Sequence, residues 1–396
     1  MTLPSLQLKK NEDHRLKNGH LWIYSNEIDT KKSPLKNFQP GEEVIIQDHQ
    51  GKSLGIAYVN PHSLITARLF SRNLADRLNA DFIQQRLNHA LSLRDRLYAE
   101  PYYRLVFGES DGLPGLVIDR FGNHIVAQCN TYGMDNRKEE ILIALRRVLP
   151  SLQSLLWRND SSIRQQEGLT NTVESGFGQP PEEVTIIENQ VKFRVPLWKG
   201  QKTGWFFDHR LNRSRLKDYV NGQTVLDVFS YLGGWGIQAA TWGAKEVCCI
   251  DSSAFACEQI SKNAELNYQQ DKVTVICEEA VIALQNLNKA NRKFDVIILD
   301  PPAFIKRRKD MKEGLIAYQR INNLALRLLN PSGIFVSGSC SMHLAYDDLV
   351  QIILKASIQC RRPLQIIEQG HQAPDHPIHP AIPETDYLKA IFTRGI

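Results

Sequence analysis

Four side chains able to carry out chemistry lie within or directly after short apolar runs in the second half of the sequence. Asp227 and Asp251 accompany the first two runs, Asp300 follows a third, and Cys340 follows a later one. Short apolar runs that alternate with stretches of helical periodicity predict parallel strands joined by helices. Ligands bind such sheets at the carboxyl ends of the strands, so we expect these side chains at one functional edge.

The first run enters a glycine-bearing turn, with Gly233, Gly234 and Gly236 where a helix would begin. Glycines there let a ligand approach the backbone, and Asp251 can accept hydrogen bonds from both hydroxyls of a ribose. The spacing departs from the G-x-G-x-x-G pattern that holds a pyrophosphate. Asp227 can instead meet a cationic group, so we expect a nucleoside with a positively charged tail, such as S-adenosylmethionine.

Asp300 opens the sequence Asp-Pro-Pro-Ala-Phe, which ends at Phe304. Pro301 and Pro302 stiffen the turn, so that the carboxylate can hold the edge of a nucleobase while the aromatic ring stacks on its face. Taken alone, such a sequence is a common turn. Its position after a nucleoside-binding unit favours base recognition.

Cys340 stands between two serines, with His343 nearby. A thiolate can attack carbon 6 of a pyrimidine and make carbon 5 nucleophilic enough to accept a methyl group. The alternative is a buried structural thiol like the other six cysteines, and His343 is equally compatible with a helix start. The expected position at the functional edge favours a nucleophile.

The elements that position these groups follow a regular strand–helix rhythm. Glu278 and Glu279 follow the third strand and therefore belong to the same edge. We expect helices at 237–242, 254–267, 280–287, 312–329 and 344–356, and strands at 225–229, 246–250, 273–276, 294–299 and 333–338, in a parallel sheet covered on both faces.

The first half of the chain has a different pattern. Short strand signals over 6–72 predict a small β-barrel, and the sequence from Gly19 to Ile28 resembles that of a PUA domain, an RNA-binding barrel. Its Trp22 and Tyr24 suit either a barrel core or base stacking. A helix at 80–98, strands, a helix at 134–148 and a loop at 176–183 then predict a compact α+β segment.

The composition is that of a globular protein, with 42% hydrophobic and 23% charged residues over 396 positions. The net charge of +5 is compatible with nucleic acid but does not require it. Seven cysteines without metal-binding spacing indicate reduced thiols and no metal site. No signal pattern or membrane-spanning run is evident, so we expect a cytoplasmic protein with no membrane partner. The sequence is also compatible with a homodimer.

Together these motifs resemble motifs I, II, IV and VI of class I S-adenosylmethionine-dependent methyltransferases. Along essentially its whole length the chain is similar to the RlmI family, and its tail from Asp375 to Lys389 is similar too. The resemblance implies a Rossmann-like doubly wound α/β domain at 199–396, a PUA-like barrel at 1–73 and a central α+β domain at 74–198. It implies methylation of cytosine carbon 5 in large-subunit ribosomal RNA, with Cys340 as nucleophile and Asp300 as the motif IV acid.

The basic and aromatic connector Lys199–Arg213 precedes the nucleoside unit, and we expect it to fold over cofactor or substrate. Pro301, Pro302 and Phe304 are expected to bind substrate. The expected cofactor-binding residues are Thr203, Phe206, Asp208, Arg210, Asp227, Phe229, Ser230, Tyr231, Gly233, Gly234, Asp251, Ser252, Glu278, Glu279 and Asp300.

Other functions stay open on the sequence alone. The same sheet serves methylation of a guanine nitrogen, which needs no cysteine. A non-catalytic RNA-binding assembly factor could retain the nucleoside site as a relic, and a nicotinamide dehydrogenase is disfavoured by the missing fingerprint. Many related 5-methylcytosine enzymes also carry a second cysteine after the motif IV proline. Here Ala303 follows Pro302, so the group that takes the carbon 5 proton is open, with Asp300 or an ordered water as candidates.

Overall fold

The computed structural model describes residues 3–396, which form two compact units. The first combines residues 3–184, 196–207 and 375–385, and the second combines residues 185–195, 208–374 and 386–396. The hairpin at 185–195 and the tail segment at 375–385 therefore pack in a different unit from their neighbours in the sequence. The three domain boundaries expected from the sequence stay a prediction.

The N-terminal part of the first unit is a five-stranded sheet in the order β1-β3-β4-β5-β2. An isolated bridge between Leu8 and Ile28 joins the chain at its two edges, so the sheet curves towards a barrel around a core that includes Ile23, Val44 and Leu69. The elements are β1 (Ser5–Gln7), α1 (His14–Lys17), β2 (Trp22–Tyr24), β3 (Glu42–Gln47), β4 (Ser53–Val59) and β5 (Ile65–Ser71).

A second five-stranded sheet, in the order β10-β9-β8-β7-β6, confirms the expected α+β segment. The helix expected at 134–148 is broken after Asp135. Its elements are α2 (Ala80–Leu97), β6 (Tyr102–Phe107), β7 (Leu116–Phe121), β8 (His124–Cys129), α3 (Tyr132–Asp135), α4 (Lys138–Val148), β9 (Ser154–Asn159), α5 (Ser162–Gln166) and β10 (Thr172–Gly178).

The loop expected at 176–183 is wrong at both ends. Its first three residues belong to β10, where Phe177 and Gly178 pair with β9 and Gly176 lies at a shift in register, and its last residue begins the strand Glu183–Glu188. Gly176 suggested a turn, but it packs where a Cβ would lie 2.3 Å from the indole of Trp157. The glycine therefore makes room for a neighbouring aromatic side chain inside a strand.

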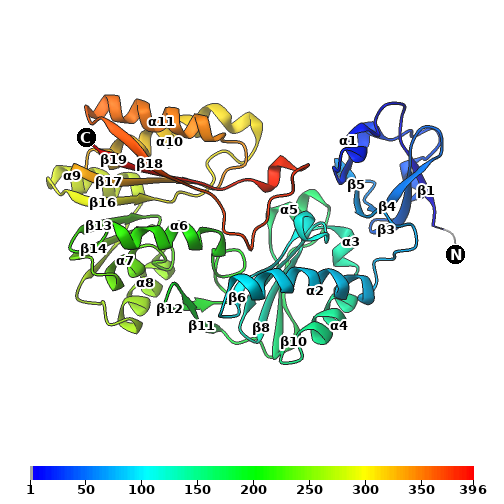
Figure 1. The fold of residues 1–396 in the computed structure, drawn as a ribbon, viewed down its shortest axis with the longest axis horizontal. Helices are drawn as coiled ribbons and strands as arrows, with labels where there is room; N and C mark the ends of the chain where they lie inside the picture. The colour runs from blue at the N-terminus through cyan, green and yellow to red at the C-terminus, as the bar shows by residue number, and fades with distance from the viewer. Residues whose placement is uncertain (1–2) are drawn as a thin grey trace. The chain divides into compact units, whose positions relative to one another are not determined.

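The second unit contains a seven-stranded sheet in the order β15-β14-β13-β16-β17-β19-β18 (Figure 1). The first five strands are parallel, as expected. The last two were not expected: β19 lies between β17 and β18 and runs antiparallel to both. The strands are β13 (Thr224–Val228), β14 (Glu246–Asp251), β15 (Val273–Cys277), β16 (Phe294–Leu299), β17 (Leu329–Ser339), β18 (Leu364–Gly370) and β19 (Lys389–Gly395), beside a hairpin of β11 (Glu183–Glu188) and β12 (Val191–Pro196).

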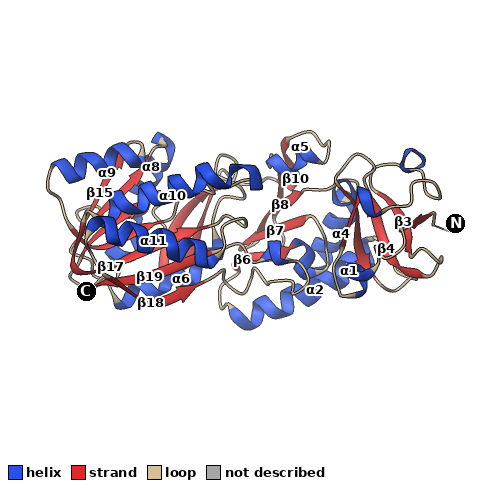
Figure 2. Ribbon diagram, turned by 90° about the horizontal axis from the view of Figure 1, so that it is seen from above, coloured by secondary structure: helices blue, strands red, loops and turns tan. Residues whose placement is uncertain are grey.

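Helices cover both faces of this sheet, as Figures 1 and 2 show. Leu226 and Val228 of β13 face the core under α9, α10 and α11, whereas Asp227 between them belongs to the opposite face, where α7 begins. The helices are α6 (Arg210–Arg215), α7 (Gly236–Thr241), α8 (Ala254–Leu266), α9 (Ala280–Lys289), α10 (Met311–Leu326) and α11 (Tyr346–Cys360).

Within residues 3–396, no helix is both long enough and apolar enough to span a membrane.

Candidate cofactor and active site

Asp227 is fully buried near the end of β13. Its Oδ2 accepts a hydrogen bond of 2.9 Å from the backbone N–H of Gly236, whereas Oδ1 has no hydrogen-bond partner among the described residues. Burial raises the pKa of this carboxyl to about 7, although the Gly236 N–H opposes the shift. A buried acceptor without a partner is costly, so this oxygen is suited to a ligand donor.

The turn after β13 has a strained backbone that Asp251 holds in place. Phe229 and Tyr231 have φ of +68° and +52°, a region that bulky residues rarely adopt. Asp251 Oδ2 accepts from the backbone N–H of Tyr231 at 2.9 Å, and Oδ1 accepts from that of Ser253 at 2.9 Å. The carboxylate thus fixes the turn to the start of α8 and retains lone pairs for other donors.

Ser230 strengthens the same turn from inside. Its hydroxyl donates to the Asp227 carbonyl at 2.7 Å and accepts from the N–H of Ile250 at 3.2 Å. Gly233 adopts φ +80°, and a Cβ there would lie 2.7 Å from the side chain of Ile237. A side chain at this position would therefore be strained.

The acids after β15 lie at the same sheet edge. The backbone N–H of Glu278 donates to the Asp251 carbonyl at 3.0 Å, and Glu278 Oε1 accepts from the N–H of Glu279, which precedes α9. Glu278 is half-buried, whereas Glu279 and Ser252 are exposed. The structure therefore brings these expected residues to Asp251, and their contact with the cofactor stays a prediction.

Two side chains, His209 and Trp235, lie against the Asp300 carboxylate at the end of β16. His209 Nε2 lies 3.1 Å from Oδ1, and the Trp235 indole N–H donates to Oδ2 at 3.0 Å. The His209 contact is close in distance but is not aligned as a hydrogen bond. Burial alone would raise the pKa of Asp300, but His209 and the Trp235 indole more than offset it and lower the pKa below its ordinary value. The carboxylate is therefore ionised and oriented.

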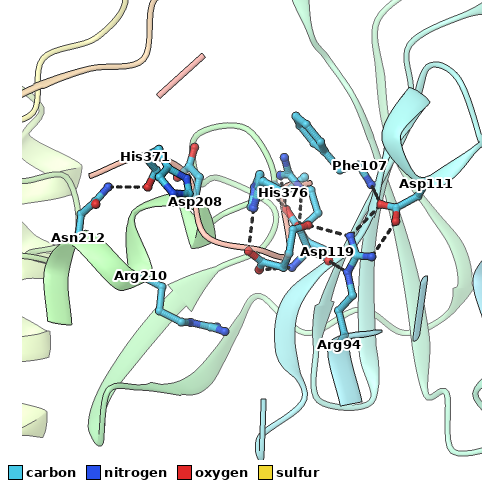
Figure 3. A network of polar contacts seen from close by, with 12 residues as sticks. Arg94, Phe107, Asp111, Asp119, Asp208, Arg210, Asn212, His371 and His376 are labelled. Atoms are coloured by element: carbon cyan, nitrogen blue, oxygen red, sulfur yellow. Dashed lines mark hydrogen bonds and ion pairs between the residues drawn. The ribbon is translucent and has the colours of Figure 1, made fainter. Parts of the chain in front are cut away.

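The proton on His209 is set by Asn212. Arg215 donates to Asn212 Oδ1 at 2.9 Å, so the amide nitrogen must face His209 Nδ1, 3.2 Å away. The same nitrogen donates to the His371 carbonyl at 3.1 Å, as Figure 3 shows. Because an amide nitrogen only donates, Nδ1 must accept, and the neutral ring carries its hydrogen on Nε2, beside Asp300.

Cys340 follows β17 and is half-buried. Its Sγ lies 4.0 Å from the Pro301 carbonyl, at the long limit of an S–H···O contact. The flanking serines are anchored: Ser339 Oγ bonds the Tyr318 hydroxyl at 2.8 Å, and Ser341 Oγ donates to the Ile305 carbonyl at 2.6 Å. The motif IV turn and the cysteine segment therefore meet directly.

The turn after Asp300 is less exposed than a free stacking platform. The Phe304 ring packs edge-to-face against Tyr318 with centroids 4.8 Å apart, and against Phe229 at 6.4 Å. It is partly buried against the sheet core, whereas Pro301 is buried and Pro302 exposed. The roles of these three residues in substrate binding stay a prediction.

The connector residues fall into separate local networks. In the first unit, buried Thr203 donates to Asp119, which pairs with Arg104, and Lys202 lies 4.6 Å from the centroid of the Phe206 ring. That unit also holds Arg94 against Asp111 in a buried ion pair (Figure 3).

The other two connector residues belong to the second unit. Asp208 accepts from the Tyr387 hydroxyl at 2.6 Å, and Arg210 Nε lies 3.6 Å from Glu188. The proposed cofactor contacts of all four connector residues stay predictions.

Three residues at the site were not singled out from the sequence: His209, Trp235 and Lys389. Trp235 lies between Gly234 and Gly236, so its position in the glycine turn was a usable signal. His209 follows Asp208, an expected cofactor-binding residue, but its contact with Asp300 depends on the fold.

The donor set at this edge fits S-adenosylmethionine. The buried carboxylate of Asp227 suits its cationic amino acid end, and Asp251 suits the ribose hydroxyls. When bound, this cofactor supplies an activated methyl group.

Comparisons with known proteins agree with the fold and with the cofactor. Residues 6–72 match a sequence model of a PUA-like domain, and residues 132–394 match that of an S-adenosylmethionine-dependent methyltransferase. Ribosomal RNA large subunit methyltransferase I of Erwinia tasmaniensis is 36% identical over 396 residues, covering 99% of both chains. The enzyme of the same name from Klebsiella pneumoniae is 35% identical over 399 residues, covering 99% of this chain and 98% of that protein.

Among solved structures, the crystal structure of SMU.776 complexed with SAH superposes with a TM-score of 0.85 at 20% identity. The match covers 99% of this chain and all of the other. This likeness confirms the expected fold class. The full-length identity to curated relatives and the matching domain models place the chain in the RlmI family of S-adenosylmethionine-dependent methyltransferases.

Proposed function

We propose that the protein methylates carbon 5 of a cytosine in large-subunit ribosomal RNA, through a covalent bond between Cys340 and carbon 6. The observation that carries the proposal is the meeting of two strand ends. The Cys340 Sγ lies 4.0 Å from the carbonyl of Pro301, the residue after Asp300. A nucleophile and an acceptor for a base edge therefore share one edge of the sheet with the residues that suit the cofactor.

The side chains support a definite division of labour. Asp300, ionised and held by His209 and Trp235, accepts from the exocyclic amine of the cytosine. The Cys340 thiolate gives an electron pair to carbon 6, and carbon 5 gains the electron density needed to take the methyl group. When carbon 5 loses its proton, the electrons of the carbon–hydrogen bond restore the double bond between carbons 5 and 6. The bond between carbon 6 and sulfur then breaks, its electron pair returns to sulfur as the thiolate, and the enzyme is free.

Features of the first unit support an RNA substrate. The curated relatives are named for large-subunit ribosomal RNA, and residues 6–72 match a PUA-like domain. Within those residues, the guanidinium of Arg15 on α1 lies 4.8 Å from the ring centroid of Tyr24 on β2, and both side chains reach solvent. A cation beside an accessible aromatic ring can meet a phosphate and stack a base. The target base must leave its stack to reach the second unit's site.

The test is methyl transfer from labelled S-adenosylmethionine to ribosomal RNA, with the product nucleoside identified. We expect 5-methylcytosine from the wild type, and at least a 10³-fold loss in Cys340→Ala because the covalent route is removed. Cys360→Ala is the matched control, since this half-buried thiol lies at the end of α11. Methylated guanine, or a Cys340→Ala variant as active as the control, would show that the rival nitrogen chemistry operates.

A second experiment detects the covalent step itself. RNA that carries 5-fluorocytosine at the target has no carbon 5 proton to lose, so the enzyme should stay attached after methyl transfer. We expect a denaturation-resistant RNA–protein species with the wild type and Cys360→Ala, and none with Cys340→Ala. RNA binding with no methyl transfer by any variant would instead favour a non-catalytic assembly factor.

A further inference from the structure

Lys389 is a buried lysine beside the proposed nucleophile. It begins β19, which runs antiparallel to β17, and its register partner on β17 is Ser339, the residue before Cys340. Only 9% of the Lys389 surface is exposed. Lysine is almost never buried without a specific partner, so this position calls for a physical explanation.

Lys389 contacts the chain on both sides of the cysteine, through its backbone on one side and its ammonium group on the other. Lys389 Nζ donates to the carbonyl of Ser341, the residue after Cys340, at 3.0 Å, and to the carbonyl of Tyr387 at 3.2 Å. Among residues 3–396 its third N–H has no hydrogen-bond acceptor. Lys389 thus spans the Cys340 segment, paired through the backbone with Ser339 and through its side chain with Ser341.

The charged groups near the start of β19 show which anion the Lys389 ammonium can stabilise. Burial lowers the pKa of Lys389, and the two groups that oppose this shift are Asp386 and Cys340. Other titratable groups near this strand end include Tyr387, whose carbonyl Lys389 contacts, and Tyr318, whose hydroxyl lies 2.8 Å from Ser339 Oγ. Cys340 and Asp300 both raise the pKa of Tyr318. Tyr318 stays neutral because burial raises its pKa to about 12, and the two carboxylates disfavour another anion. Lys389 is therefore the cation placed to favour a thiolate.

The proposed reaction needs that thiolate twice. An ordinary thiol has a pKa of about 8.5, and burial raises the pKa of Cys248 and Cys257 in this unit to about 12. Burial disfavours the charged thiolate, whereas a nearby cation favours it. The thiolate must exist before it attacks carbon 6, and it forms again when the carbon–sulfur bond breaks.

We propose that Lys389 is a positioning residue that fixes the Cys340 segment through the Ser341 carbonyl and stabilises the thiolate of Cys340. This inference rests on the proposed function for its role in catalysis, but the effect on the thiol can be measured without RNA or cofactor.

The experiment follows alkylation of Cys340 by iodoacetamide as a function of pH, with peptides resolved by mass spectrometry. Lys389→Met keeps the length and the burial but removes the charge, and Lys389→Arg keeps the charge. We expect the pH midpoint for Cys340 to rise by about one unit or more in Lys389→Met. The rate at pH 7.5 should then fall about tenfold, with a much smaller shift in Lys389→Arg. The exposed thiol of Cys277, on the far edge strand, is the internal control.

An unchanged Cys340 midpoint in Lys389→Met, with Cys277 reacting as in the wild type, would overturn the inference. Misfolding is recognised separately, because it would alter the alkylation rate of Cys277. The Lys389→Arg variant keeps the positive charge and therefore tests whether that charge is what lowers the Cys340 midpoint. The inference also predicts that raising the pH restores methyl transfer in Lys389→Met. If instead Cys340→Ala still makes 5-methylcytosine, the proposed function fails while the alkylation result stands.

Discussion

Replacing Asp227 with Asn should stabilise the folded protein at alkaline pH while weakening cofactor binding. The carboxyl is fully buried, with one oxygen bonded to the Gly236 N–H and the other without a partner in the described chain. Ionising it inside the protein is costly, and an amide removes that cost. The amide oxygen can still accept from Gly236, so the turn before α7 keeps its anchor.

The magnitude follows from the pKa, which rises from 3.8 to about 7 on folding. Between these pH values the folded carboxyl keeps a proton that the unfolded carboxyl has lost, so unfolding releases a proton. The free energy of unfolding therefore falls as the pH rises through this window and levels off above pH 7, after a total loss of about 4 kcal/mol. Asn does not titrate and escapes this loss.

The assay is thermal unfolding at pH 4 and pH 8.5. The transition to follow is the one whose midpoint temperature S-adenosylmethionine raises in the wild type. The midpoint of Asp227→Asn relative to wild type should be higher at pH 8.5 than at pH 4 by roughly 10 °C. Cofactor affinity at pH 7.5 should fall by about tenfold or more, because a charge-assisted contact is lost.

The control is Asp295→Asn, which should show the opposite trend. Hydrogen bonds from Thr224 and Asn330 outweigh burial and lower the pKa of Asp295, so its ionised form stabilises the fold above pH 4. If the difference in unfolding midpoint between Asp227→Asn and wild type were the same at both pH values, the buried carboxyl of Asp227 would not have a raised pKa. The assignment to the cationic end of the cofactor would then lose its physical basis.

Two further predictions concern the substrate side. His209→Ala should lower the rate of methyl transfer by about 10- to 100-fold, because the contact with the charged Asp300 carboxylate is lost. The pKa of Asp300 rises without His209, so the loss of activity on acidification should shift to higher pH. His209→Gln, whose amide can still donate, should recover most of the rate, and equal rates in both variants would contradict the role of His209. Replacing the four basic residues after Phe304 with Ala should weaken RNA binding and make its logarithmic salt dependence shallower by about 2 to 3 units in a filter-binding titration; an unchanged slope would mean that this run is only a solvated surface. These residues are Lys306, Arg307, Arg308 and Lys309.

Much of the second unit follows from local sequence. The alternation of apolar runs with helical periodicity identified the five parallel strands, because each strand–helix unit is encoded within about 30 residues. Parallel strands place their carboxyl ends together, so Asp227, Asp251, Asp300 and Cys340 could be assigned to one edge before the structure was known. The glycine turn and the PUA-like segment were likewise readable from residue types and their order.

Only the tertiary structure decided what surrounds those residues. His209 lies 91 positions before Asp300 and Lys389 lies 48 after Ser341, and nothing in their local sequence specifies these contacts. The antiparallel β19 enters between β17 and β18, a non-local pairing that no single segment encodes. Arg94 similarly reaches the carbonyl of Asp375, 281 residues away. Sequence patterns specify which faces are apolar, whereas the partners of a buried charge depend on which distant segments pack together.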